Sequence, residues 1–313
     1  MDRRTFMAVV GASVLPLMAG CSVDTTAPEA AGVLPIDPDK LARIAVTGTV
    51  FRSNFDNWEH TQPEAQPRLG LLDYPKFIRD NFGVTNLELW SPQIALLGDT
   101  EDDYRRVRAA VDEAGMKIVN LQVEGTPSLN VQTEAEQDKV VAAISGWLDR
   151  AKILGAGAAR VNVTRDTGDV NLPAVIAILR RAAEYGKTIG VRVLVENHGG
   201  YTASIPDMIG LVKAVNHEFC KITIDWGDWN PPGDRYAAMQ EAMPFTHIVS
   251  AKGYAFDPQT NEHTEYDVGR LVRNAEAGGF TGIYSIDFWG PTAPTDTAKA
   301  LKLFIRSITD NLA

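Results

Sequence analysis

The sequence has little cysteine, a deficit of positive charge and no long apolar run, and each shortage excludes a class of protein. Two cysteines among 313 residues cannot form the disulfide framework of a small secreted domain. The 30 Lys and Arg against 40 Asp and Glu give a net charge of −10 at pH 7. This balance argues against a nucleic-acid partner, because binding to phosphates needs a basic surface. The 45% of hydrophobic and 22% of charged residues are instead typical of a chain that buries a sizeable core.

Residues 1–20 have the composition of an export signal. The pair Arg3-Arg4 with Phe6 resembles a twin-arginine signal, and residues 7–20 form an uncharged, weakly apolar run. The run is too short to span about 30 Å of hydrocarbon but fits the apolar part of a signal peptide. It ends in Met18-Ala19-Gly20-Cys21, which resembles a bacterial lipobox. We therefore expect export, a lipid on Cys21, and a protein that is periplasmic or anchored to the membrane by that lipid alone.

Residues 21–42 are rich in Thr, Ala and Pro and lack periodicity, which predicts a flexible tether. If Cys21 carries lipid, Cys220 has no disulfide partner, and we expect it to be a small buried residue.

From residue 43 onward, apolar strand-like runs alternate with helix-period segments. The runs cover residues 43–50, 86–90, 117–123, 159–163, 192–196, 221–225, 247–252 and 282–288. The clearest helical segments are 102–114, 134–154, 172–189 and 267–277, and several end next to a glycine: Gly83, Gly115, Gly155 and Gly190. Eight units of roughly 34 residues predict an α/β fold, a single-domain (β/α)8 TIM barrel over residues 43–313. No G-x-G-x-x-G follows the first run, which disfavours a dinucleotide-binding fold.

Carboxylates end three of the predicted strands. Glu196, Asp225 and Asp287 each follow an apolar run, at the end of the barrel where active sites lie. Three acids placed together repel one another unless a cation lies among them, and oxygen ligands suit Mg²⁺ or Mn²⁺. His198 lies two positions after Glu196, on the same side of an extended strand. It is a candidate nitrogen ligand, which keeps Mn²⁺ and adds Co²⁺ and Zn²⁺ as alternatives.

Four motifs in order resemble the sugar phosphate isomerase/epimerase family of the xylose isomerase-like barrel superfamily. They are Val195-Glu196-Asn197-His198-Gly199-Gly200, Ile224-Asp225-Trp226-Gly227, Val249-Ser250-Ala251-Lys252 and Ser285-Ile286-Asp287-Phe288. The resemblance covers about residues 43–310 and implies that Glu196, Asp225 and Asp287 bind one divalent metal. It further implies that the acids on strands five and eight move a proton.

Two positions depart from the family pattern. Ser250 stands where many relatives have a His or Gln ligand, and Asp287 stands where they usually have Glu. His198 is our candidate replacement ligand. His247 lies at an odd offset from Ser250, so it faces the opposite side, and we expect a structural role for it.

The expected activity is that of a divalent-metal-dependent sugar isomerase or epimerase. The base is Glu196 or Asp287, and Lys252 donates to a substrate oxygen; an ion pair of Lys252 with Asp225 or Glu196 is the alternative. Proton abstraction next to a carbonyl gives epimerisation, isomerisation or, with loss of a β-oxygen, elimination from a 3-keto-glycoside. A non-catalytic sugar-binding lipoprotein is an alternative of another class.

Further polar and aromatic residues fall at or just past the strand ends and are candidate sugar contacts. They are Glu88, Trp90, Glu124, Asn162, His198, Trp226, Asp228 and Trp289, with Gln122, Arg160, Trp229 and Tyr254 nearby. Asp228 could instead be a turn residue, and residues 54–68 could form a lid or a surface loop. Export favours a free sugar, keto-sugar or glycoside over a phosphorylated one. The oligomeric state is left open.

Overall fold

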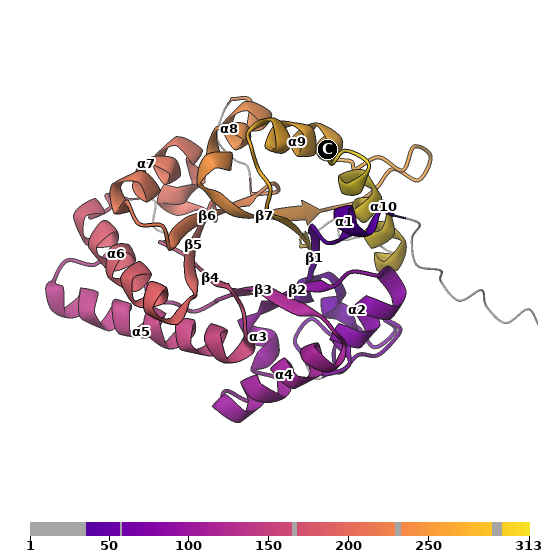
Figure 1. Ribbon diagram of the computed structural model, residues 1–313, viewed down its shortest axis with the longest axis horizontal. Coiled ribbons are helices and arrows are strands. Elements are labelled where there is room, and N and C mark those ends of the chain that lie inside the picture. Colours follow the sequence, from indigo (N-terminus) through magenta and orange to yellow (C-terminus); the bar gives the residue numbers. More distant parts are fainter. Residues whose placement is uncertain (1–35, 57, 165–167, 229–232, 290–295) are drawn as a thin grey trace, which may run out of the picture. The chain divides into compact units, whose positions relative to one another are not determined.

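A closed barrel of parallel strands forms the centre of the computed structural model, which describes residues 36–313 except 57, 165–167, 229–232 and 290–295. The strands follow one another around the barrel in chain order, and β8 pairs with β1 (Figure 1). They are β1 (Ile44–Thr47), β2 (Asn86–Trp90), β3 (Lys117–Gln122), β4 (Ala158–Val161), β5 (Arg192–Glu196), β6 (Cys220–Asp225), β7 (Thr246–Gly253) and β8 (Ile283–Phe288). The predicted TIM barrel is thereby confirmed. The predicted signal peptide (1–20) and Cys21 lie outside the described residues.

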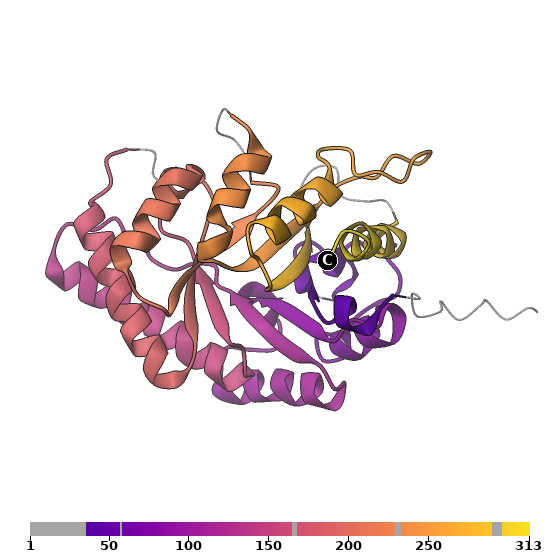
Figure 2. The same cartoon turned by 45° about the horizontal axis from the view of Figure 1, so that its top comes forward.

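Helices surround the barrel, as Figures 1 and 2 show. The α-helices are α1 (Pro38–Leu41), α2 (Tyr74–Phe82), α3 (Ser91–Ile94), α4 (Glu101–Glu113), α5 (Glu134–Leu154), α6 (Leu172–Ile189), α7 (Ile205–Val215), α8 (Arg235–Ala242), α9 (Val268–Ala277) and α10 (Thr297–Thr309). Short 3₁₀ helices are η1 (Gly48–Asn54), η2 (Gly200–Ala203) and η3 (Met243–Phe245). Among the described residues, no helix is long and apolar enough to cross a membrane.

Local sequence signals set the helix ends. Thr100 and Thr133 each begin a helix with a capping box, in which the side chain three residues later binds back to the first backbone N–H. The four glycines expected after helices have φ between 64° and 79°, a range that an L side chain rarely adopts. These signals explain why the helices stop where the strands must begin.

The barrel interior changes from apolar to polar along its axis. Ala158, Leu194 and Ile248 form a buried apolar cluster near the strand starts, away from the main core between strands and helices. Two residues further along β4, β5 and β7, the buried side chains are Arg160, Glu196 and Ser250. Because alternate residues of a strand face the same side, these polar groups also point into the barrel.

Besides shifts of one or two residues at other elements, two boundaries differ from the sequence prediction. The first strand ends at Thr47 rather than at residue 50, and η1 follows it. Gln93 Nε2 donates to Gly48 O at 2.8 Å, and a Cβ on Gly48 would lie 1.7 Å from Gln93 Oε1, so the chain turns where only glycine fits.

The predicted tether of residues 21–42 is too long at its C-terminal end, because α1 lies within it. Asp37 caps this helix through Asp39 N at 2.9 Å, and Leu41 is buried. Lys40 Nζ donates to Leu312 O at 2.7 Å, which ties the helix to the C-terminal residues. Cys220 is buried, as expected.

Candidate active site

A cavity of about 290 Å³ opens where the strands end, and it collects most of the residues singled out in the sequence. Glu196 of β5, Asp225 of β6 and Asp287 of β8 all line it. The other lining residues are Thr49, Trp90, Gln122, Glu124, Arg160, His198, Lys252 and Trp289. The cavity therefore combines five carboxylate or imidazole groups with two permanent cations.

Asp225 is held by hydrogen bonds at both of its oxygens. Oδ1 accepts from the backbone N–H groups of Gly227 (2.7 Å) and Asp228 (3.0 Å), and Oδ2 accepts from Ser250 Oγ (3.1 Å). Lys252 Nζ lies 2.9 Å from the same Oδ2. Burial raises the pKa of Asp225 to about 6, and the Lys252 charge opposes this rise.

Lys252 is the cation of the β7 strand end. Its side chain is 6% exposed, and Nζ lies 3.2 Å from Asp228 Oδ1 as well as 2.9 Å from Asp225 Oδ2. Burial lowers the pKa of Lys252, but the carboxylates of Asp225, Asp287 and Asp228 outweigh burial and raise this pKa well above its usual value. Lys252 is thus a buried ammonium group, and the ion pair considered from the sequence is present.

Arg160 of β4 pairs with the acids on the other side of the cavity. Its Nε lies 3.2 Å from Glu196 Oε2 and its Nη1 lies 3.1 Å from Glu124 Oε1. Arg160 and Glu196 are both buried, whereas a quarter of the Glu124 side chain is exposed. Glu196 therefore has its negative charge balanced by a protein cation within the cavity wall.

Asp287 differs from the other acids in its partners. Oδ1 of Asp287 accepts hydrogen bonds from the hydroxyls of Thr49 and Thr47, and the bond from Thr47 is 3.5 Å long. Within the described part of the chain, no Lys, Arg or His lies at ion-pair distance from it. Lys252 and Asp287 are register partners in the β7–β8 pair, so the ammonium group and this carboxylate come from adjacent positions.

His198 contacts both halves of the cavity. Its Nδ1 lies 2.8 Å from Asp228 Oδ2 and 3.5 Å from Glu196 Oε2. The hydrogen bond to Asp228 raises the pKa of His198, against the opposing effect of burial. The same contact and Lys252 lower the pKa of Asp228 to about 2, although burial raises it.

Aromatic rings form one wall of the cavity. The Trp90 ring centroid lies 5.5 Å from that of Trp289 and 5.4 Å from that of Trp58, and the His60 ring lies 5.1 Å from Trp289. The guanidinium of Arg52 lies over the Trp289 ring at 4.6 Å. Flat indole faces of this kind can pack against the C–H groups of a sugar.

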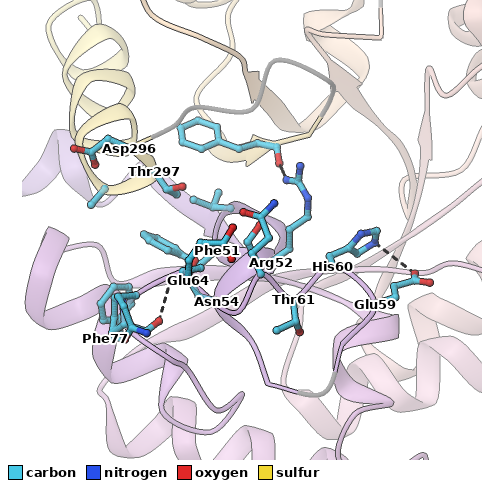
Figure 3. Close-up of a pocket in the computed structure, with 18 residues that line it drawn as sticks. Phe51, Arg52, Asn54, Glu59, His60, Thr61, Glu64, Phe77, Asp296 and Thr297 are labelled. Atoms are coloured by element: carbon cyan, nitrogen blue, oxygen red, sulfur yellow. Dashed lines mark hydrogen bonds and ion pairs between the residues drawn. The ribbon is translucent and has the colours of Figure 1, made fainter.

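A larger hollow of about 1070 Å³ lies behind this wall, next to η1 (Figure 3). Arg52 donates to Phe288 O there, and His60 lies 3.4 Å from Glu59. Because Arg52 and His60 also contact Trp289, the loop of residues 54–68 borders both spaces.

Comparison with known proteins identifies the family. The model of the xylose isomerase-like TIM barrel family matches residues 80–308. The chain belongs to the xylose isomerase-like TIM barrel family. No protein of curated function matches it in sequence.

Solved structures share the fold of this xylose isomerase-like protein at low identity. An L-ribulose 3-epimerase is 15% identical with a TM-score of 0.67, covering 87% of this chain and 94% of its own. A xylose isomerase-like TIM barrel protein from Mycobacterium smegmatis in complex with magnesium is 15% identical (TM-score 0.64; 88% and 99% covered). A probable 3-DHS dehydratase from Bacillus anthracis is also 15% identical (TM-score 0.61; 85% and 98% covered).

The acids of this family member, as they are arranged, do not form a metal-ligand set. In the described ranges, no three His, Cys, Asp or Glu side chains converge closely enough to hold one ion. The predicted ligands instead bind protein groups: Asp225 binds Lys252 and Glu196 binds Arg160. The predicted ligand His198 pairs with Asp228. The metal remains a prediction from the sequence.

Three predicted sugar contacts lie elsewhere in the barrel. Glu88 is fully buried below the cavity and accepts from Asn120 Nδ2 at 2.5 Å. Trp226 is also fully buried and packs against Tyr284 at 5.7 Å, because it alternates with the inward-facing Asp225 and so faces the helices. Asn162 lines a neighbouring hollow. None of the three is among the residues that line the cavity.

The remaining predicted residues are placed as follows. Trp90, Glu124 and Trp289 line the cavity, and Asp228 lies behind its wall against Lys252 and His198. Trp229 lies outside the described residues. His247 lies near the strand starts, where burial lowers its pKa to about 4.

The sequence analysis gave little or no importance to two residues that line the cavity, Thr49 and Arg160. Thr49 was not singled out, since a threonine just after a short strand gives no chemical signal. Arg160 was only one of several nearby polar residues. A charged residue inside an apolar run is a usable signal, because a buried charge needs a partner.

Proposed function

We propose that this protein is a sugar isomerase or epimerase that removes a proton next to a carbonyl group. The observation that carries the proposal is that Asp287, an acid with no ion-pair partner among the described residues, lines the same cavity as Lys252, its register neighbour on β7. A carboxylate that accepts a proton and a cation that stabilises the resulting oxyanion are the two groups such a reaction needs.

In the proposed reaction, Lys252 Nζ donates a hydrogen bond to the substrate carbonyl oxygen. Asp287 takes the proton from the neighbouring carbon, and the C–H electron pair moves into the carbonyl to give an enediolate. β5 is three strands from β8 around the closed barrel, so Glu196 reaches the cavity from another side. Return of this proton by Asp287 to the adjacent carbon, with the hydroxyl proton passing between the two oxygens, gives the isomer. For epimerisation, Glu196 must start protonated: it delivers its proton to the opposite face and ends ionised, while Asp287 ends protonated.

The cavity favours an uncharged sugar. Its two permanent cations, Arg160 and Lys252, are both paired with carboxylates, so neither offers an unused charge to a phosphate group. Trp90 and Trp289 supply apolar faces for the ring. Two of the similar structures are sugar epimerases by name, an L-ribulose 3-epimerase and a D-psicose 3-epimerase. Their names support a sugar or keto-sugar substrate.

Elimination of a β-oxygen from a 3-keto-glycoside is the second candidate. The observation that favours it is His198, which lines the cavity and is held by Asp228 at 2.8 Å. In this reaction the same proton is removed, the C–O bond to the aglycone breaks, and His198 protonates the leaving oxygen.

The test is incubation of the protein with a panel of free and 3-keto sugars in D₂O, followed by NMR. We expect deuterium at a carbon next to the carbonyl and loss of this exchange, by at least about a hundredfold, in Asp287→Asn. Asp102→Asn, an exposed position on α4, is the matched control and keeps the activity. Exchange with release of an aglycone identifies the lyase. Sugar binding without any exchange contradicts the proposal and identifies a sugar-binding protein.

We also propose that residues 1–20 direct export and that Cys21 carries a lipid. The full chain expressed in a bacterial host should then fractionate with membranes, and Cys21→Ala should move it to the soluble periplasmic fraction. Retention of Cys21→Ala in the membrane fraction contradicts lipidation. Export of a variant with Arg3 and Arg4 replaced by Lys contradicts the twin-arginine route.

A further inference from the structure

The lone pairs of Asp225 are fully used by the protein. An ionised carboxylate has about four lone-pair sites. At Asp225 these sites receive two backbone N–H groups, the Ser250 hydroxyl and the Lys252 ammonium, at 2.7 to 3.1 Å. A metal bound to Asp225 would have to displace at least one of these donors.

Among these donors, Lys252 carries a positive charge, as a bound metal ion would. It lies among the carboxylates of Asp225 and Asp228 and next to Asp287 in the strand register, with a side chain that is 6% exposed. A buried ammonium group and a divalent cation at the same carboxylates would repel strongly in a site with little water.

A second cation balances the remaining strand-end acid. Arg160 lies 3.2 Å from Glu196 Oε2, and both side chains are less than 5% exposed. Ser250, at the position where the family resemblance leads one to expect a ligand, donates to Asp225 instead. Arg160 of β4 and Lys252 of β7 thus engage the carboxylates of Glu196 and Asp225 that a metal would need, and Ser250 supplies no ligand in their place.

We propose that Lys252 takes the place of the divalent cation that the strand-end acids would otherwise bind, and that this barrel works without a metal. Lys252 balances the acids in the resting protein and, in the reaction proposed above, carries the positive charge that stabilises the enediolate oxygen. The catalytic part of this inference rests on the proposed function. The binding part does not, because it concerns the protein without substrate.

The experiment measures Mn²⁺ uptake by the full-length protein, using the electron paramagnetic resonance signal of free Mn²⁺ and the metal content after dialysis. We expect the native protein to take up no stoichiometric Mn²⁺. Lys252→Met removes the buried charge and leaves Asp225 without its cation, so uptake should rise to about one Mn²⁺ per chain. Lys187→Met, an exposed lysine on α6 that pairs with Glu218, is the control and takes up none.

The outcomes separate the two proposals. One retained Mn²⁺ per native chain overturns the inference, and so does a folded Lys252→Met that binds no Mn²⁺. Should Lys252→Met fail to fold, Lys252→Gln, a neutral side chain of similar reach, is measured in its place against the same expectation. Absence of deuterium exchange with any sugar overturns the proposed function but leaves the Mn²⁺ result unchanged.

Discussion

The pKa of a titratable residue in this barrel depends on how deeply the residue is buried as much as on its neighbours. Glu88 is on β2, in the interior below the cavity, and has no exposed surface. Burial raises its pKa from 4.5 to about 7, although Ser285, Asn120 and Arg160 oppose the rise. The carboxyl group is therefore neutral in the folded protein at pH values where it is ionised in the unfolded chain.

This difference predicts a pH-dependent stability at the residue scale. The folded pKa lies above the unfolded value, so stability is highest below pH 4.5 and is lost as the pH rises through 7. Glu88→Gln removes the effect, and its free energy of unfolding relative to the native protein should rise by about 2 kcal/mol between pH 5 and pH 8. Urea denaturation at the two pH values measures this, with the exposed Glu113→Gln as control. An equal difference at both pH values would contradict the assignment.

The face of the strand on which each side chain lies could be predicted from the sequence at these positions. The depth of the side chain in the barrel and its ion-pair partner could not. Alternation along a strand is enough to place Asp225 inside the barrel and Trp226 outside it, a rule that the prediction of Trp226 as a sugar contact did not apply. Glu88 shares a face with Trp90 yet lies below the cavity, since depth depends on the stagger of neighbouring strands. Which acid Lys252 contacts depends on the conformation of its long side chain, and no local sequence pattern encodes that conformation.

At the scale of elements, the segment after β6 supports the strand-end cation. Gly227 follows Asp225 and Trp226, and a Cβ there would lie 2.6 Å from Cδ of Lys252 and 2.7 Å from the Tyr254 hydroxyl. Because Gly227 has no side chain, the aliphatic part of Lys252, from the next strand, has room beside this loop. The loop and the strand act as one unit in positioning the ammonium group.

Gly227→Ala should therefore displace Lys252 without unfolding the barrel. We expect the proton-exchange rate to fall by roughly tenfold to a hundredfold, since small displacements of catalytic groups have effects of this size. The free energy of unfolding should fall by about 1–3 kcal/mol from overpacking. Gly210→Ala on α7, where no atom lies within 4 Å of the new Cβ, is the control and leaves exchange unchanged. A normal rate in Gly227→Ala would contradict this account.

The regular elements were more predictable than the short ones. β2 and β5 and the helices α5 and α6 have the predicted bounds, because their apolar periods are long and end at clear turn residues. α1 and η1 were missed, since both are held by contacts with distant residues, such as Lys40 with Leu312 and Gln93 with Gly48. Contacts between residues 45 or more positions apart leave no local pattern.

At the scale of the whole barrel, closure between β1 and β8 is secured by Arg43. Its guanidinium binds both Glu276 oxygens at 2.8 and 2.9 Å and also reaches the carbonyls of Phe280 and Gly282 at 3.1 Å. These partners belong to α9 and to the segment that leads into β8. One side chain therefore joins the first and last strands at the end of the barrel opposite the cavity.

Arg43→Ala should weaken the closure and leave the half-buried Glu276 without its cation. We expect a loss of about 3 kcal/mol in the free energy of unfolding, measured by denaturant titration of the intact barrel. Arg105→Ala removes an exposed ion pair on α4 and should leave the unfolding midpoint unchanged. Equal effects of the two substitutions would show that the seam does not depend on Arg43.

The aromatic wall gives the protein an internal optical probe. Trp90 and Trp289 face the cavity, whereas Trp226 is sealed between β6 and the helices. A sugar that enters the cavity replaces water at these two of the six indoles and leaves Trp226 unchanged. The emission spectrum should therefore shift on ligand entry, so candidate compounds can be screened by their fluorescence titration curves before any turnover is known.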